Sequence, residues 1–134
     1  MGLDMALYSR KKGTENNILY RGKEEFYWRK ANAIHKWFVD NIQEGIDDCG
    51  KYEVSKEQLI ELVSIIGEIL EEPNKVEQIK LAKELLPTCP GFFFGSYDYD
   101  SYYFETLENT YETLGILLNR INFNEYDIFY QSSW

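Results

Sequence analysis

The chain has little of what builds a metal centre or a disulfide framework. Of its 134 residues, one is histidine and two are cysteine. Cys49 and Cys89 belong to no CxxC pair and to no histidine cluster, so the sequence supports neither a zinc site nor a dense set of disulfides. We therefore expect reduced thiols, and we expect neither a metal nor a cofactor.

Long apolar runs and an excess of positive charge are also absent. No stretch approaches the roughly 20 apolar residues that cross a bilayer, and the start lacks the pattern of a secretory signal. These absences predict an intracellular protein without a membrane partner. The formal net charge of -9 argues against binding of long nucleic acid, whose affinity comes from Lys and Arg on phosphates. A small anion is not excluded, because the local field of a pocket can differ in sign from the net charge.

Aromatic residues are abundant instead. They make up 16% of the chain, with 11 Tyr, 8 Phe and 3 Trp, and 44% of all residues are hydrophobic. Tyrosine suits half-buried surfaces and interfaces, because its ring is apolar and its hydroxyl forms hydrogen bonds. This composition predicts a globular protein, and the length fits a single domain over residues 1–134.

Hydrophobic periodicity predicts a strand at the start and a long helix soon after it. Residues 3–8 alternate between apolar and polar, which is typical of a half-buried strand. Residues 9–17 are expected to form a loop and residues 18–21 a short strand. The acidic residues that precede the next apolar stripe predict a helix from about residue 25 to residue 43.

The remaining helices begin at recognisable caps. Ser55 and Gln58 form a capping box that opens a helix ending before Pro73. Asn74 opens the next helix, and apolar residues at steps of three and four predict a last one over residues 104–121. Three further strands are expected at residues 52–54, 92–94 and 126–132.

The order of these elements defines the expected fold class. Strands and helices do not alternate regularly, as they would around a parallel sheet. We therefore expect a single α+β domain in which a small, mostly antiparallel sheet packs with about four helices. The strands at residues 3–8, 92–94 and 126–132 should share that sheet.

Residues 27–37 contain the strongest candidates for a ligand site. On the expected helix, Trp28, Asn32 and His35 lie along one line because they are four and three residues apart. An indole can stack on a flat ligand, Arg29 can grip a phosphate, and Asn32 can bind a polar edge. His35 is the candidate acid or base if the protein is an enzyme, and otherwise a hydrogen-bonded structural residue.

Two other segments add polar groups to the predicted site. A glycine at the end of the strand over residues 92–94 would let a ligand approach the backbone, and the neighbouring serine and tyrosine offer hydroxyls. The candidate ligand-binding residues outside the helix are Gly95, Ser96, Tyr99, Ser132, Ser133 and Trp134. No calcium-loop spacing and no GxSxG element accompanies them, so no metal ligand and no serine nucleophile is predicted.

These segments resemble those of a family of small phage and prophage proteins of unassigned function. The family opens with Met-Gly-Leu-Asp-Met and carries Tyr-Trp-Arg-Lys-Ala-Asn-x-Ile-His, then Leu-Leu-Pro-Thr and Gly-Phe-Phe-Phe-Gly-Ser, and closes on Tyr-x-Ser-Ser-Trp. The chain departs at Ala6, where a tyrosine is expected. The resemblance implies a phage protein expressed in the cytoplasm of a bacterial host.

Together these observations predict a non-enzymatic protein that binds a small nucleotide-like ligand as a homo-oligomer. It would be similar in kind to the anti-defence sponges that sequester cyclic-nucleotide immune signals, which is an analogy and not a motif match. One alternative is a small hydrolase or transferase for a phosphorylated substrate, with His35 as acid or base. Another is an inhibitor that binds a host protein through its acidic, Tyr-rich surface.

Overall fold

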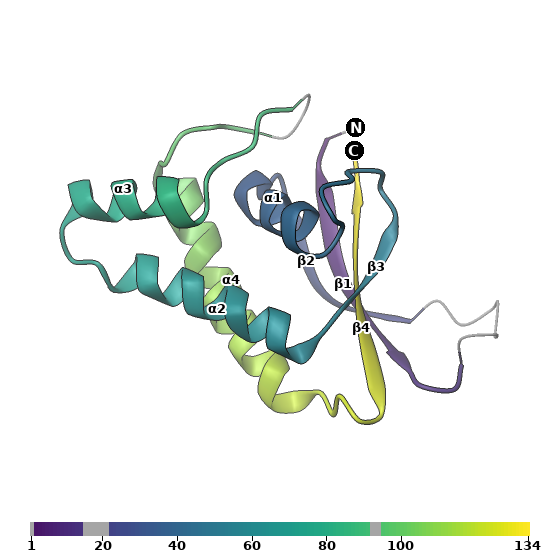
Figure 1. Ribbon diagram of the computed structural model, residues 1–134. Coiled ribbons are helices and arrows are strands. Elements are labelled where there is room, and N and C mark those ends of the chain that lie inside the picture. Colours follow the sequence, from purple (N-terminus) through teal and green to yellow (C-terminus); the bar gives the residue numbers. More distant parts are fainter. Residues whose placement is uncertain (1, 15–21, 92–94) are drawn as a thin grey trace.

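The part of the chain that the structure describes folds into one antiparallel sheet and four helices. The computed structural model describes residues 2–14, 22–91 and 95–134 (Figure 1). Their elements are β1 (Asp4–Lys11), β2 (Lys23–Arg29), α1 (Asn32–Asn41), β3 (Lys51–Val54), α2 (Lys56–Glu71), α3 (Lys75–Leu85), α4 (Ser101–Arg120) and β4 (Tyr126–Ser133). The α+β class is confirmed.

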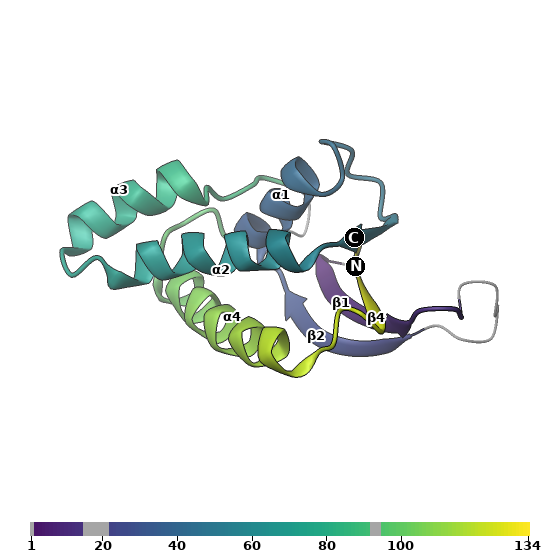
Figure 2. The ribbon, with the colours of Figure 1, turned by 60° about the horizontal axis from the view of Figure 1, so that its bottom comes forward.

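The sheet has the strand order β2-β1-β4-β3, and every neighbouring pair is antiparallel. The first and last strands pair along their whole length, from Asp4 opposite Ser133 to Lys11 opposite Tyr126. All four helices lie on one side of this sheet (Figures 1 and 2). We call the opposite face of the sheet the open face, because none of the described helices covers it.

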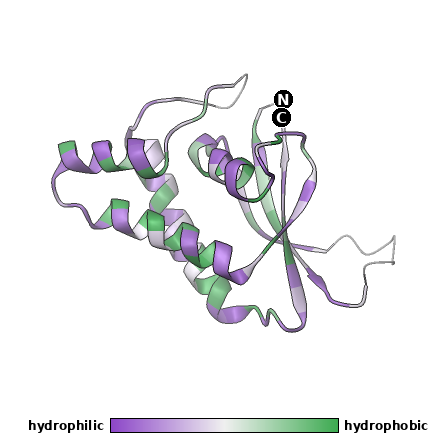
Figure 3. Cartoon of the chain, viewed as in Figure 1, coloured by the Kyte–Doolittle hydropathy of each residue, from purple (hydrophilic) through white to green (hydrophobic). Residues whose placement is uncertain are grey.

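The core lies between the sheet and the helices. Leu7 of β1 and Tyr130 of β4 lie opposite each other in the strand register. Because side chains alternate between the two faces of a sheet, both of these point inward. Both are fully buried, and the Tyr130 ring stacks on Phe38 of α1 at 3.9 Å between centroids. Hydrophobic and hydrophilic residues alternate along the helices (Figure 3), as expected for helices with one buried side. The buried rings therefore fix α1 against the centre of the sheet.

The predicted caps are present at the starts of α2 and α3. The Ser55 hydroxyl accepts a hydrogen bond from the Gln58 amide at 3.1 Å, and the Gln58 side chain accepts one from the Ser55 amide at 2.9 Å. Asn74 accepts from the Glu77 amide at 3.0 Å. Helix α4 begins a few residues before its predicted start because Asp100 caps it through the Tyr103 amide.

The Ser55→Ala variant is expected to lose about 1 kcal/mol of unfolding free energy, because the Gln58 amide at the start of α2 loses the hydroxyl that accepts its hydrogen bond. Urea denaturation followed by circular dichroism measures the loss. The matched control is Ser64→Ala in the exposed middle of the same helix, where alanine is the better helix former. Equal stability of the wild type and the Ser55→Ala variant would contradict the prediction.

The helix expected over residues 25–43 is wrong in its first part. Residues 23–29 form strand β2, and α1 begins only at Asn32. Buried Phe26 and Trp28 alternate with more exposed neighbours, which is the pattern of a strand. Pairing with β1 provides hydrogen bonds for the backbone N–H and C=O groups of this segment, as a helix would also do. Lys30 then adopts a left-handed conformation, with φ of 55°, and separates the strand from the helix.

Two smaller expectations also differ from the structure. Strand β1 continues to Lys11, so the loop expected over residues 9–17 begins later than predicted. The strands expected at 18–21 and 92–94 lie outside the described residues. The strand predicted at 52–54 is confirmed as β3, and the one at 126–132 as β4.

Candidate functional site

Trp28 faces the core and not a ligand pocket. It is 4% exposed, its ring stacks on Phe26 at 4.0 Å, and its indole N–H donates to the Thr110 hydroxyl of α4 at 2.8 Å. The prediction that Trp28, Asn32 and His35 share one helix line is therefore wrong, because Trp28 belongs to a strand. Its role as a stacking surface for a ligand is corrected to a packing role.

Asn32 joins α1 to the segment that follows α3. Its side-chain amide donates to the Ser96 carbonyl at 2.9 Å, and its side-chain carbonyl accepts from the Cys89 amide at 2.9 Å. Gly95 packs beside Lys30, where an added Cβ would lie 3.0 Å from the Lys30 Cβ, and its φ of +91° favours glycine. The structure thus brings together Asn32, Gly95 and Ser96, three of the candidate ligand-binding residues.

This cluster has little room for a ligand. Tyr99 accepts a hydrogen bond from the Thr88 amide at 3.1 Å, which fastens the same segment at a second point. The cavity beside Asn32 and Ser96 has a volume of about 30 Å³. Drug-sized ligands occupy roughly 300 Å³ or more. Asn32, Ser96 and Tyr99 therefore act in holding the backbone, and Gly95 permits its close approach.

His35 is completely buried in a hydrogen-bonded chain. Its Nε2 lies 3.0 Å from a carboxylate oxygen of Asp47, whose other oxygen accepts from the Trp134 indole at 3.0 Å. An ionised carboxylate only accepts, so Nε2 carries a proton. Burial, with the nearby Asp47 charge, raises the pKa of Tyr130, so its hydroxyl is protonated and donates to Nδ1 at 2.6 Å.

The chain Tyr130–His35–Asp47–Trp134 ties α1 to β4 and to the loop after α1. It connects the closing segment of the sequence with the residue 27–35 segment, while the Lys30 amide bonds to the Leu3 carbonyl at 2.7 Å. Hydrogen bonds from the start of α1 and the residues just before it therefore reach Leu3, Cys89, Ser96 and Tyr130. The His35 ring is buried, and both of its nitrogens lie within hydrogen-bond distance of other side chains.

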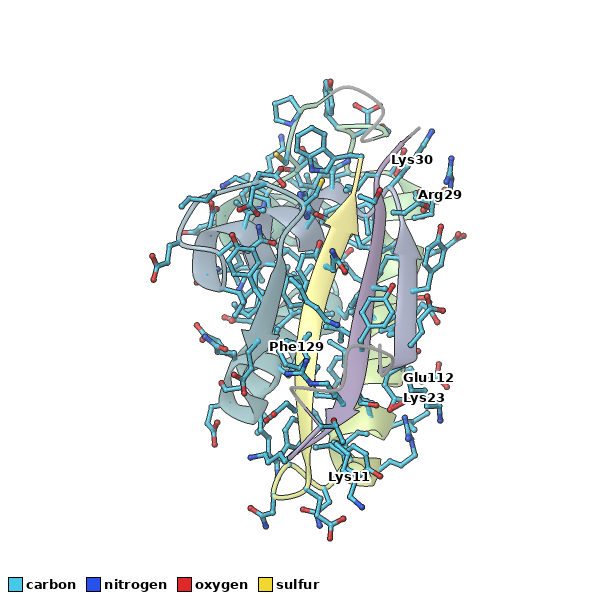
Figure 4. The ribbon with its side chains drawn as sticks, turned by 90° about the vertical axis from the view of Figure 1, so that its right-hand side faces the viewer. Lys11, Lys23, Arg29, Lys30, Glu112 and Phe129 are labelled. Carbon is cyan, nitrogen blue, oxygen red and sulfur yellow. The ribbon has the colours of Figure 1, made fainter. Side chains whose placement is uncertain are left out.

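The open face presents a different set of side chains, and strand register places them in three rows. From β2 across to β3, the rows are Arg29, Asp4 and Ser133; then Tyr27, Ala6, Gln131 and Lys51; then Glu24, Tyr8, Phe129 and Glu53. Figure 4 shows this face with the helices behind the strands. Aromatic rings and cations therefore share a surface that no helix covers.

A hollow of about 370 Å³ lies in this face. Its floor includes Ala6, the smallest side chain of its row. The polar and aromatic side chains of its lining include two carboxylates: Asp4, Tyr8, Glu24, Tyr27, Gln131 and Ser133. This volume falls within the range of small-molecule sites. A tyrosine at position 6 would fill the space that alanine leaves open.

Arg29 and Asp4 border one end of the hollow. The guanidinium lies 2.9 Å from Asp4 and its side chain is 52% exposed. A hydrogen bond from the Tyr27 hydroxyl, together with Arg29, lowers the pKa of Asp4, so that carboxylate is ionised. Arg29 and Ser133 thus lie on a common surface. The Ser132 side chain, in contrast, points inward and is 2% exposed.

Charge is distributed unevenly around this face. Residues 1–30 contain seven of the 14 Lys and Arg but only four of the 23 Asp and Glu. Arg29, Lys23 and Lys11 follow the β1–β2 side of the sheet (Figure 4). The β1–β2 side is therefore relatively positive in a molecule that is acidic overall.

Other kinds of site find no support in the described part of the chain. There, no group of three or more His, Cys, Asp and Glu side chains could hold a metal ion. None of the helices described has the length and hydropathy needed to cross a membrane. A comparison with protein-family models finds no match, and comparisons with curated proteins and with solved structures likewise find none.

Proposed function

We propose that this protein is a non-catalytic binding protein for a small nucleotide-like ligand, and that the hollow above Ala6 is its site. The observation that carries the proposal is a hollow of about 370 Å³ between Tyr8 and Tyr27 on an uncovered sheet face. Aromatic rings stack on bases, and the Gln131 amide can both donate to and accept from a base edge. Arg29 supplies a charge at the rim.

The buried polar chain supports binding over turnover. His35 is 0% exposed, and its two ring nitrogens are both engaged within the fold. A general acid or base must come within hydrogen-bond reach of its substrate. We extend the proposal to sequestration of a cyclic-nucleotide signal in an infected bacterium by a homo-oligomer. The phage origin and the oligomeric state rest on the sequence resemblance and on analogy, and they stay predictions.

Isothermal calorimetry against cyclic mono- and dinucleotides tests the site. The Tyr27→Ala variant is expected to weaken binding about tenfold or more, because a stacked base contributes roughly 1–3 kcal/mol. Tyr111→Ala is the matched control, since Tyr27 and Tyr111 are 47% and 44% exposed but Tyr111 lies on α4. Ligand recovered after heating the complex should be chemically unchanged.

A second variant tests the hollow itself. Ala6→Tyr places a ring in the space the ligand would occupy and is expected to abolish the calorimetric signal while the unfolding midpoint stays close to that of the wild type. Absence of heat with every nucleotide, equal losses in Tyr27→Ala and Tyr111→Ala, or recovery of a converted ligand would overturn the proposal.

A further inference from the structure

Two cations on the open face lie against the same aromatic ring. The Arg10 guanidinium carbon of β1 is 4.6 Å from the Phe129 ring centroid, and the Lys51 Nζ of β3 is 5.3 Å from it. Lys51 Nζ is also 5.6 Å from the centroid of Tyr8. Ring faces attract cations, so Tyr8 and Phe129 hold two like charges near one another.

No carboxylate neutralises this pair. Among the described residues, neither Arg10 nor Lys51 has an Asp or Glu oxygen within 4.0 Å. Asp127, opposite Arg10 in the register, is instead paired with Lys12 at 3.6 Å. Glu53 stands in the row of Phe129 but forms no ion pair with a described cation.

Arg10 also has a donor without an acceptor. Its Nε is buried and has no hydrogen-bond partner within the described part of the chain. Buried donors in folded proteins are nearly always bonded, so an orphaned one indicates a missing acceptor. A guanidinium is fully charged at all ordinary pH values, which makes an anionic acceptor the favourable one.

The electrostatics of Lys51 agree with this geometry. Partial burial and the positive charge of Arg10 lower the pKa of Lys51. An anion between the two side chains would offset both effects, because it replaces lost hydration and screens the repulsion.

We propose that Arg10 and Lys51, together over Phe129, form a phosphate site on the open face. This inference rests on the proposed function for the ring-binding hollow, and it names the ligand class as a phosphorylated nucleotide and not an uncharged nucleoside. Lys51 stands in the row of Ala6, two strand spacings or on the order of 10 Å away. A base above Ala6 and a phosphate between Arg10 and Lys51 would therefore belong to one ligand.

Calorimetry with matched nucleosides and nucleotides tests the phosphate site. Arg10→Gln and Lys51→Met are each expected to weaken nucleotide binding about tenfold or more, the loss typical of one charge-assisted bond. Lys56→Met is the matched control, because Lys56 Nζ also lies over a ring, 5.9 Å from the Phe123 centroid, but on α2. Circular dichroism and unfolding midpoints verify that each variant is folded.

A titration of Lys51 with inorganic phosphate provides an independent readout. The Lys51 pKa, followed by NMR of its side chain, should rise in phosphate relative to the same ionic strength of chloride, and the rise should be absent in Arg10→Gln. If nucleosides bind as tightly as nucleotides, or if Lys56→Met weakens binding as much as Lys51→Met, the phosphate site is overturned while the ring site stands. If inorganic phosphate shifts Lys51 but nucleosides and nucleotides do not bind, the phosphate site stands and the proposed function fails.

Discussion

The His35→Ala variant is expected to lose about 4 kcal/mol of unfolding free energy, because the buried Tyr130 hydroxyl loses its acceptor, Asp47 loses one donor and a cavity forms at α1. Tyr130, which is 0% exposed, loses the acceptor of its 2.6 Å hydrogen bond. Asp47 loses its 3.0 Å donor and keeps the Trp134 indole. Urea denaturation measures the change, provided that the slope with urea concentration is the same in both proteins.

A double variant separates the orphaned hydroxyl from the cavity. In His35→Ala the Tyr130 hydroxyl has no acceptor, and Tyr130→Phe removes that hydroxyl. The double variant should therefore lose less unfolding free energy than the sum of the losses in the two single variants. A loss below about 1 kcal/mol in His35→Ala, within the range of surface substitutions, would contradict the structural role. Retention of nucleotide binding by the folded fraction is the companion result, because His35 contacts no part of the open face.

The Trp28→Ala variant is also expected to lose about 4 kcal/mol, the cost of removing a large buried ring from a packed core. Trp28 lies between Phe26 and Phe38, with ring centroids at 4.0 and 6.0 Å. Thermal and urea denaturation measure this loss. Trp134→Phe is the control, since Trp134 is 51% exposed and its truncation should cost far less.

The milder Trp28→Phe variant decides between packing and ligand contact. It keeps a ring in the core and removes only the hydrogen bond to Thr110. It should therefore bind nucleotides as the wild type does. A folded Trp28→Phe protein that has lost binding would mean that the indole contacts ligand, and that the core assignment is wrong.

The fold class was predictable because its signals are local. Caps at Ser55 and Asn74 mark helix starts wherever the helix packs, and alternation over β1 and β4 is readable within a short window. The error at residues 23–29 arose because this segment fits two periods. Phe26 and Trp28 match a strand, whereas Trp28, Asn32 and His35 match a helix, and pairing with β1 decides between them from outside the window.

The candidate site was predictable only in part. Asn32 and His35 stand out by residue type, and the structure does engage them with the distant segments named beside them. The polar groups of Asn32 and His35 form hydrogen bonds within the protein, and the residue types alone do not predict these partners. Ala6 and Gln131 carry no distinctive chemistry, and only the register of β1 with β4 makes them neighbours. Reading residues 23–29 as a strand would have placed Tyr27 and Arg29 on the face opposite Trp28.

The concentration of cations in residues 1–30 gives the molecule a permanent electric dipole. The β1–β2 hairpin lies at one side of the protein, and α2 and α3 lie at the other (Figure 1). Near a negatively charged surface at low ionic strength, the molecule would turn its hairpin toward that surface despite its net charge of -9. The same dipole would attract an anionic solute from bulk solvent toward the positively charged hairpin side of the protein.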